Sequence, residues 1–177
     1  MDETTTVQPS GGSGQKVLWI VLGVVVLLIV LGSIVARSVG FMAMKSAGVD
    51  VDRKGNGSVT YSNNDASVTV GAGANMPANW PSDAPPAYAG ATIMYSGTSN
   101  PQTGKAGSAV MYNTSASMQS VAEYYTTRLK AEGWTIEGTA NMGGTQVISA
   151  KKDTRTIGIS ITDAGDGTVS VTAGVGF

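Results

Sequence analysis

Few residues of this chain have side chains suited to chemistry, and the two commonest kinds are missing. The 177 residues include no histidine and no cysteine. This removes the usual general base, the thiolate nucleophile and the commonest transition-metal ligands. Carboxylates such as Glu123, Glu132 and Asp153 are left, and a pair of them could act as general acid and base. We expect a protein that is not an enzyme, with no catalytic residue, no cofactor and no metal, and keep a carboxylate-dependent enzyme as an alternative.

Basic residues gather near one predicted turn. Ser149 and Lys152 match the S-x-x-K pattern, in which the lysine activates the serine one helical turn away. The segment reads as a strand, where residues three apart point to opposite faces, so this chemistry is not expected. Lys151, Lys152 and Arg155 could bind an anion at the turn. A solvated hairpin tip that protects a sheet edge is the preferred interpretation.

The last third of the chain alternates with period two, which predicts strands with one apolar and one hydroxyl-rich face. Aligned hydroxyls can donate hydrogen bonds to a glycan or lie beside an added strand. The plain alternative is an ordinary solvated sheet face. The candidate interaction surface consists of Thr156, Ser160, Thr162, Thr168, Ser170 and Thr172.

The second half of the chain contains the elements that would position this surface. Strands are expected around 91–97 and 108–113, followed by a helix that Ser115 would cap. Its apolar stripe ends before Gly133, and Trp134 begins the next strand. Residues 146–172 predict a three-stranded antiparallel meander. The fold class expected is α+β: a single N-terminal transmembrane helix, then a small domain with an antiparallel sheet covered by one helix. The predicted stripe consists of Met118, Val121, Ala122, Tyr125 and Leu129.

The stretch before this domain divides into two parts. Residues 49–71 predict a β-hairpin around Asn63 to Asp65. Residues 72–90 are rich in proline and glycine, which disfavour helix interiors and central strands, and predict an extended connector. Trp80 and Tyr88 within it are expected to pack over the edge of the core. Residues 91–177 then form the α+β domain.

The N-terminal region contains the longest apolar run. Residues 17–36 are uncharged and mostly apolar, which at 1.5 Å per residue is roughly 30 Å, the thickness of a bilayer's hydrocarbon core. We expect a disordered tail over 1–16 and a single transmembrane helix over 17–36, with the helix extended to about residue 46. The lipid bilayer is then one partner, and Gly32 with Ala36 is a small-xxx-small pair that could join two such helices. The residues that mark the span are Val17, Trp19, Gly23, Gly32 and Ala36.

Two arguments about orientation conflict. The positive-inside rule compares Lys16 with the basic residues that follow the span and would place the domain in the cytoplasm. The domain's Gly, Ser, Thr and Asn content is more usual outside the cell, and we expect an extracytoplasmic domain on an uncleaved signal anchor. From Lys45 onward nine basic residues face ten acidic ones. This balance excludes a polybasic face for nucleic acid.

A resemblance supports the same location. The Pro-rich entry from Trp80, the turn at Tyr88 to Ala91 and the helix sequence VAEYYTTRLKAEGW are followed by the predicted meander. This arrangement resembles a group of uncharacterised bacterial membrane-anchored extracytoplasmic domains with a YPGA-like turn and an FY…L…GW-like helix. The resemblance covers residues 80–174. It implies a fold and a location, and no catalytic residue.

Together these observations predict a single-pass, membrane-anchored extracytoplasmic protein with a non-enzymatic domain for binding or envelope organisation. A sensory or assembly-accessory subunit of a membrane complex is the first alternative, with another membrane or envelope protein as partner. The carboxylate-dependent enzyme is the second. The sequence leaves the ligand and the oligomeric state open.

Overall fold

The computed structural model describes residues 48–63, 66–99 and 106–177. These ranges lie within one compact unit, Gly40–Phe177, and contain nine strands and one helix. In chain order the elements are β1 (Asp50–Arg53), β2 (Val59–Ser62), β3 (Ala66–Val70), β4 (Thr92–Ser99), β5 (Gly107–Thr114), α3 (Met118–Ala131), β6 (Thr135–Met142), β7 (Thr145–Lys152), β8 (Arg155–Asp163) and β9 (Val169–Gly176).

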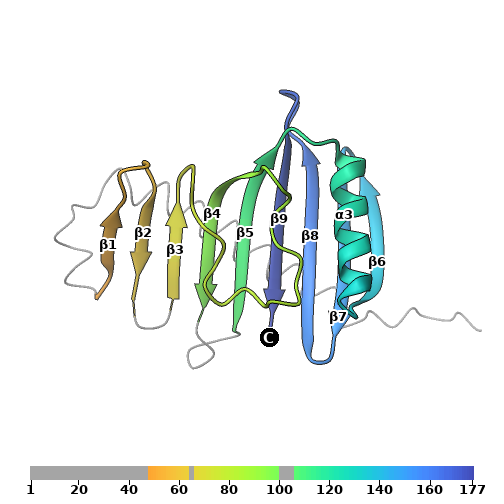
Figure 1. The fold of residues 1–177 in the computed structure, drawn as a ribbon, viewed down its shortest axis with the longest axis horizontal. Helices are drawn as coiled ribbons and strands as arrows, with labels where there is room; N and C mark the ends of the chain where they lie inside the picture. The colour runs from red at the N-terminus through yellow and green to blue at the C-terminus, as the bar shows by residue number, and fades with distance from the viewer. Residues whose placement is uncertain (1–47, 64–65, 100–105) are drawn as a thin grey trace, which may run out of the picture. The chain divides into compact units, whose positions relative to one another are not determined.

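All nine strands form one antiparallel sheet in the order β1-β2-β3-β4-β5-β9-β8-β7-β6 (Figure 1). The predicted meander is present as β7, β8 and β9, with Ile148 opposite Ile159 and Ile159 opposite Ala173. The last strand returns to pair with β5 along its whole length. This pairing places β9 inside the sheet, between the central strand β5 and β8.

The predicted fold class is wrong, because the sheet is far larger than one helix can cover. The segment expected to be a separate hairpin forms three strands, and β3 pairs with β4 from Ala66 opposite Ser99 to Val70 opposite Tyr95. Nine strands about 4.8 Å apart extend over roughly 38 Å, whereas a helix is about 10 Å wide. The described part of the chain is therefore mainly a wide antiparallel sheet with α3 over one end.

Helix α3 begins two residues later than the sequence predicted. Ser117 is the N-cap, and its hydroxyl accepts a hydrogen bond from the backbone N–H of Ser120 at 3.1 Å. The predicted stripe is buried at Val121, Ala122, Tyr125 and Leu129. It packs against β6, β7 and β8.

Another part of the same sheet face is covered by residues 71–91, which we call the strap. Figure 1 shows this segment crossing the strands on the side where α3 lies. Its first part is attached to β4, where Gly71 N–H and Gly73 N–H donate to the carbonyls of Met94 and Ile93 at 2.9 and 3.1 Å. We call the side covered by α3 and the strap the helix face of the sheet.

The core lies between this cover and the central strands. Its largest fully buried side chains include Tyr112, Tyr125, Leu129 and three isoleucines of β8. Tyr112 Oη donates to Tyr125 Oη at 2.9 Å, so the two phenols satisfy each other. Burial raises the pKa of Tyr112 to about 12. Trp80 and Tyr88 pack against the core, as predicted for the connector.

The predicted membrane span lies outside the described residues, as do the tail over 1–16, the proposed extension to residue 46 and the residues Val17, Trp19, Gly23, Gly32 and Ala36. Within the described ranges, no helix has the length and apolar character needed to cross a membrane.

Candidate functional site

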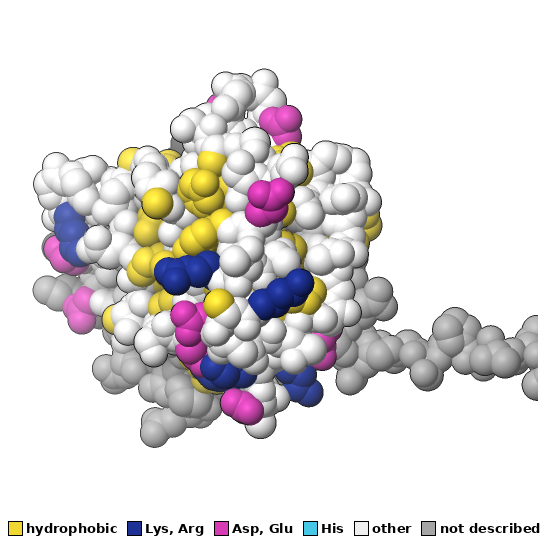
Figure 2. Space-filling model, turned by 45° about the vertical axis from the view of Figure 1, so that its right-hand side comes forward, with side chains coloured by type: hydrophobic (Ala, Val, Ile, Leu, Met, Phe, Trp, Pro, Cys, Tyr) yellow, Lys and Arg dark blue, Asp and Glu magenta, His cyan; other side chains and the backbone are white. Residues whose placement is uncertain are grey.

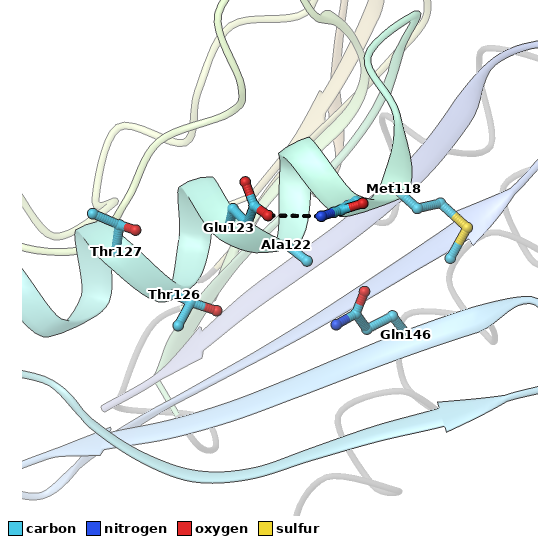
Figure 3. Close-up of a pocket in the computed structure, with 7 residues that line it drawn as sticks. Met118, Ala122, Glu123, Thr126, Thr127 and Gln146 are labelled. Carbon is cyan, nitrogen blue, oxygen red and sulfur yellow. Dashed lines mark hydrogen bonds between the residues drawn. The ribbon is translucent and has the colours of Figure 1, made fainter.

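The first groove on the helix face lies between α3 and β7, and we call it the helix groove. It has a volume of about 540 Å³ and opens to solvent. Figure 3 shows Ala122 and Thr126 pointing toward the strand that carries Gln146, with Glu123 and Thr127 turned away from it. The lining residues are Met118, Gln119, Ala122, Glu123, Thr126, Thr127 and Gln146.

The helix groove follows from how α3 sits on the sheet. Residues three and four apart share one side of a helix, so Gln119 and Thr126 lie in line with Ala122, at the border of the buried stripe. Gln146 precedes the buried Ile148 by two residues on β7 and therefore lies on the helix face. Beyond it, β6 is exposed from Glu137 to Met142. The groove thus has an apolar floor at Met118 and Ala122 and a polar rim that is uncharged except at Glu123.

The rim contains a single carboxylate. Glu123 accepts a hydrogen bond from the Gln119 side-chain amide at 2.9 Å. Glu132 caps the other end of α3, and Asp153 lies in the β7–β8 turn with φ of 54°. The helix groove contains no second acidic residue. The arrangement needed for a carboxylate pair is therefore not present in it.

The basic residues at the β7–β8 turn have an internal partner. Arg155 donates two hydrogen bonds to Asp83 of the strap and Lys152 donates one, each at 2.7 Å. The hydrogen bonds from Arg155, followed by the one from Lys152, hold the pKa of the Asp83 carboxyl well below its usual value. The turn is therefore neither a free anion site nor a solvated tip, because the Asp83 carboxylate is already bound to the cationic groups of Lys152 and Arg155.

Two further contacts complete this cluster. The indole N–H of Trp134 donates to the Asp83 carbonyl at 2.6 Å, and the Arg155 guanidinium lies 5.3 Å from the centre of the Trp134 ring. Ser149 donates to the Gly138 carbonyl at 3.4 Å, away from Lys152. Ser149 and Lys152 of the S-x-x-K pattern therefore do not act on each other.

The predicted interaction surface lies on the sheet face opposite α3. Ser160 of β8 is directly opposite Thr172 of β9, and Thr162 is opposite Ser170. Thr162 also exchanges a hydrogen bond with Thr145 at 3.0 Å. The structure thus brings these four predicted hydroxyls together.

The other two predicted members are set apart from that group. Thr156 is opposite Gly176, near the end of β8. Thr168 lies just before β9, where its backbone N–H and its hydroxyl both donate to Asp166. These two bonds hold Thr168 in the turn before β9, so it does not belong to the group of four hydroxyls.

The sequence does not identify the helix groove as a site. In the sequence, Met118 and Ala122 belong to the predicted core stripe, Glu123 is only one of several carboxylates, and Gln146 begins the predicted meander. A signal was present in the polar residues that border the apolar stripe at helical spacing. It could not be interpreted without knowing which strand lies under that side of α3.

Charges on the surface are sparse and mixed. Figure 2 shows Lys and Arg side chains interspersed with Asp and Glu among mainly uncharged and hydrophobic side chains. This agrees with a charged fraction of 13% for the whole chain. A ligand or partner on the surface shown in Figure 2 would be recognised through neutral polar and apolar contacts.

A protein-family model described as START domain-like matches residues 93–171. The match covers less than half of the chain and runs from β4 into β9, so it includes α3 and the helix groove. It agrees with the expectation of a small domain in the second half of the chain and does not test the individual motifs of the predicted resemblance. No curated protein and no solved structure is similar enough to this chain to count as a match.

Proposed function

We propose that the domain binds a small amphipathic ligand in the helix groove and does not catalyse a reaction on it. The observation that carries this proposal is the groove itself: an apolar floor, a rim of neutral polar side chains and one carboxylate, inside the START domain-like match. START-like domains are typically binding domains. A volume of about 540 Å³ lies within the range of small-molecule sites, roughly 300 to 1,000 Å³.

The chemistry of the lining selects the ligand class. Met118 is adaptable and polarizable, so it can fit an irregular apolar group. Gln119, Thr126 and Gln146 can each donate and accept hydrogen bonds to a neutral head group. Glu123 disfavours an anion at the rim. A ligand with a short apolar part and a neutral polar end fits these residues.

The test is binding of a named probe, the neutral fluorescent dye Nile red, to the full-length chain. The chain is purified in a zwitterionic detergent. Binding is measured at a detergent concentration too low for micelles to take up the dye. Binding is followed by dye fluorescence and competed with a neutral monoacylglycerol. The variant Thr126→Trp fills the groove, and we expect it to weaken binding at least tenfold, about 1.4 kcal/mol.

The matched control is Lys130→Trp, at an exposed position of the same helix outside the groove. It adds the same indole and should bind the dye like the wild type. Equal loss in both variants, or none in Thr126→Trp, would overturn the assignment to this groove.

We also propose that residues 17–36 anchor this domain outside the cell as a single membrane span. The support is the sequence alone: an uncharged run about as long as a bilayer is thick. Reporters active on one side of the membrane, fused after Phe177, test the orientation. Activity of the cytoplasmic reporter would reject an extracytoplasmic domain.

A further inference from the structure

The helix face of the sheet changes character between β4 and β5. Residues directly opposite each other in an antiparallel pair point to the same face. One row across the sheet runs through Asp52, Thr60, Thr69 and Ser96, and then through Val110, Ala173, Ile159 and Ile148. The row is polar on β1 to β4, apolar on β5, β9, β8 and β7, and ends at the exposed Thr139 on the edge strand β6. Only the second half of the helix face therefore belongs to the core.

The next row along the strands makes the same change one strand later, between β5 and β9. It passes through Ser62, Ser67, Thr98 and Ser108 before it reaches the buried Val175 and Ile157. Adjacent strands place these side chains about 4.8 Å apart, and alternate residues along one strand are about 6.8 Å apart. The first strands thus present a two-dimensional array of hydroxyls on the helix face.

This array forms the floor of a second groove, which we call the hydroxyl groove. Its volume is about 260 Å³, and its wall is the first part of the strap, from Gly73 to Ala78. Lys54 lies at its rim. The hydroxyls on the floor belong to Ser58, Thr60, Ser67, Thr69, Ser96 and Thr98.

The wall of the hydroxyl groove is fixed at both ends. At one end the Asn56 amide donates to the Gly73 carbonyl at 3.1 Å. At the other end Ser108 Oγ donates to the Asn79 side chain at 2.9 Å. Ala74 and Pro77 are buried between these anchors, while Asn75 is exposed. A ligand would therefore meet a preformed groove and would not have to order the strap.

Several floor hydroxyls have hydrogen-bonding capacity left. Thr60 and Thr69 share one hydrogen bond at 2.9 Å, so each keeps a further lone pair. Ser67, Ser96 and Thr98 make no side-chain hydrogen bond to another described residue, and Ser96 is only 7% exposed. Hydroxyls that can donate and accept, placed on a rigid sheet, suit a ligand whose own polar groups are hydroxyls.

We propose that the hydroxyl groove binds a neutral carbohydrate, one sugar ring at a time. A sugar offers hydroxyls to the floor, and its C–H face can pack against the apolar surface of Met76, Pro77 and Ala78 on the wall. The Asn75 amide is available to a ring substituent. A groove of about 260 Å³ has room for a single sugar ring. This proposal does not depend on the ligand of the helix groove.

The experiment is amide proton–nitrogen NMR of the full-length chain with maltotriose, cellotriose and N-acetylchitotriose. The chain is held in a zwitterionic detergent, since a maltoside detergent would compete. Each sugar is added to about 10 mM, enough to occupy a site with a Kd of about 1 mM. We expect at least one sugar to shift the amides of β2 to β4 and of residues 73–78.

Two variants locate the site. Thr69→Val removes a floor hydroxyl while keeping the side-chain shape, and Asn75→Ala removes an exposed amide with little effect on folding. Each should weaken sugar binding at least fivefold. The matched control Thr172→Val removes a hydroxyl from the opposite sheet face and should bind like the wild type, as should Thr126→Trp in the helix groove.

Three outcomes would overturn the proposal: no shifts with any of the sugars, shifts confined to β8 and β9, or loss of binding in Thr172→Val equal to that in Thr69→Val. Loss of dye binding in Thr126→Trp with sugar binding intact would support both grooves. Unchanged dye binding in Thr126→Trp, together with weakened sugar binding in Thr69→Val, would reject the helix groove and leave the hydroxyl groove supported.

Discussion

The ion cluster at Asp83 connects the strap to the sheet, and its removal should destabilise the domain measurably. Asp83 accepts three hydrogen bonds from Arg155 and Lys152, and its side chain is 26% exposed. A hydrogen bond to a charged group contributes about 1.5 to 3 kcal/mol, while a fully exposed ion pair contributes at most about 1. Because solvent reaches a quarter of the carboxylate, we expect Asp83→Asn to cost about 2 kcal/mol in total.

The assay is thermal and urea unfolding of the full-length chain, followed by circular dichroism. A loss of about 2 kcal/mol should lower Tm by roughly 8 °C for a domain of this size. The matched control is Asp153→Asn in the adjacent turn, which removes the same charge. Asparagine tolerates the left-handed conformation found there, φ of 54°, so the control should stay within about 0.5 kcal/mol of the wild type.

The pH dependence of the same difference provides a second check. The pKa of Asp83 is lower in the folded protein than its ordinary value of 3.8, so folding favours the charged form. Its contribution is complete above about pH 4 and is lost as the pH falls further. The gap between wild type and Asp83→Asn should therefore narrow in acid. A gap that is absent at pH 7, or that is as large for Asp153→Asn, would refute a stabilising role for the cluster.

Three further predictions concern the core and α3. Leu129→Ala should cost about 3 kcal/mol in urea unfolding, since this fully buried side chain leaves a cavity under the helix; a cost below about 1 kcal/mol would contradict the packing. The Tyr112 phenol should make stability fall between pH 10 and about 12, because its pKa rises on folding and the unfolded chain loses the proton first; Tyr112→Phe should remove that part of the alkaline loss, and an unchanged profile would count against it. Gly133→Ala should cost about 1 kcal/mol in thermal unfolding, because φ is +81° while the added Cβ would meet only the Lys152 side chain at 3.9 Å, an ordinary contact; a neutral result would show that the backbone there relaxes.

Local elements of the second half could be predicted because their signals lie in neighbouring residues. The period-two pattern from Ile157 to Ile161 identified a half-buried strand, and the spacing from Val121 to Leu129 identified the inner side of α3. Trp80 and Tyr88 were correctly expected to pack on the core. Each of these follows from side chains that a single strand, helix or connector must bury.

The extent of the sheet could not be predicted in the same way. Whether β3 stays in a separate hairpin or pairs with β4 depends on backbone hydrogen bonds between residues about thirty positions apart, which leave no local pattern. The same is true of Asp83, whose partners Lys152 and Arg155 follow about seventy residues later. The basic turn was therefore interpreted without its acidic partner.

The sequence by itself determined composition and local periodicity: no histidine or cysteine, few charges, an apolar run over residues 17–36, and the alternation of apolar and hydroxyl side chains. Only the tertiary structure decided which hydroxyls share a groove. Ser67, Thr98 and Asn75 come together because strand register and the path of the strap align them. Register is a cooperative property of the whole sheet, since one residue of slip would turn every side chain to the other face.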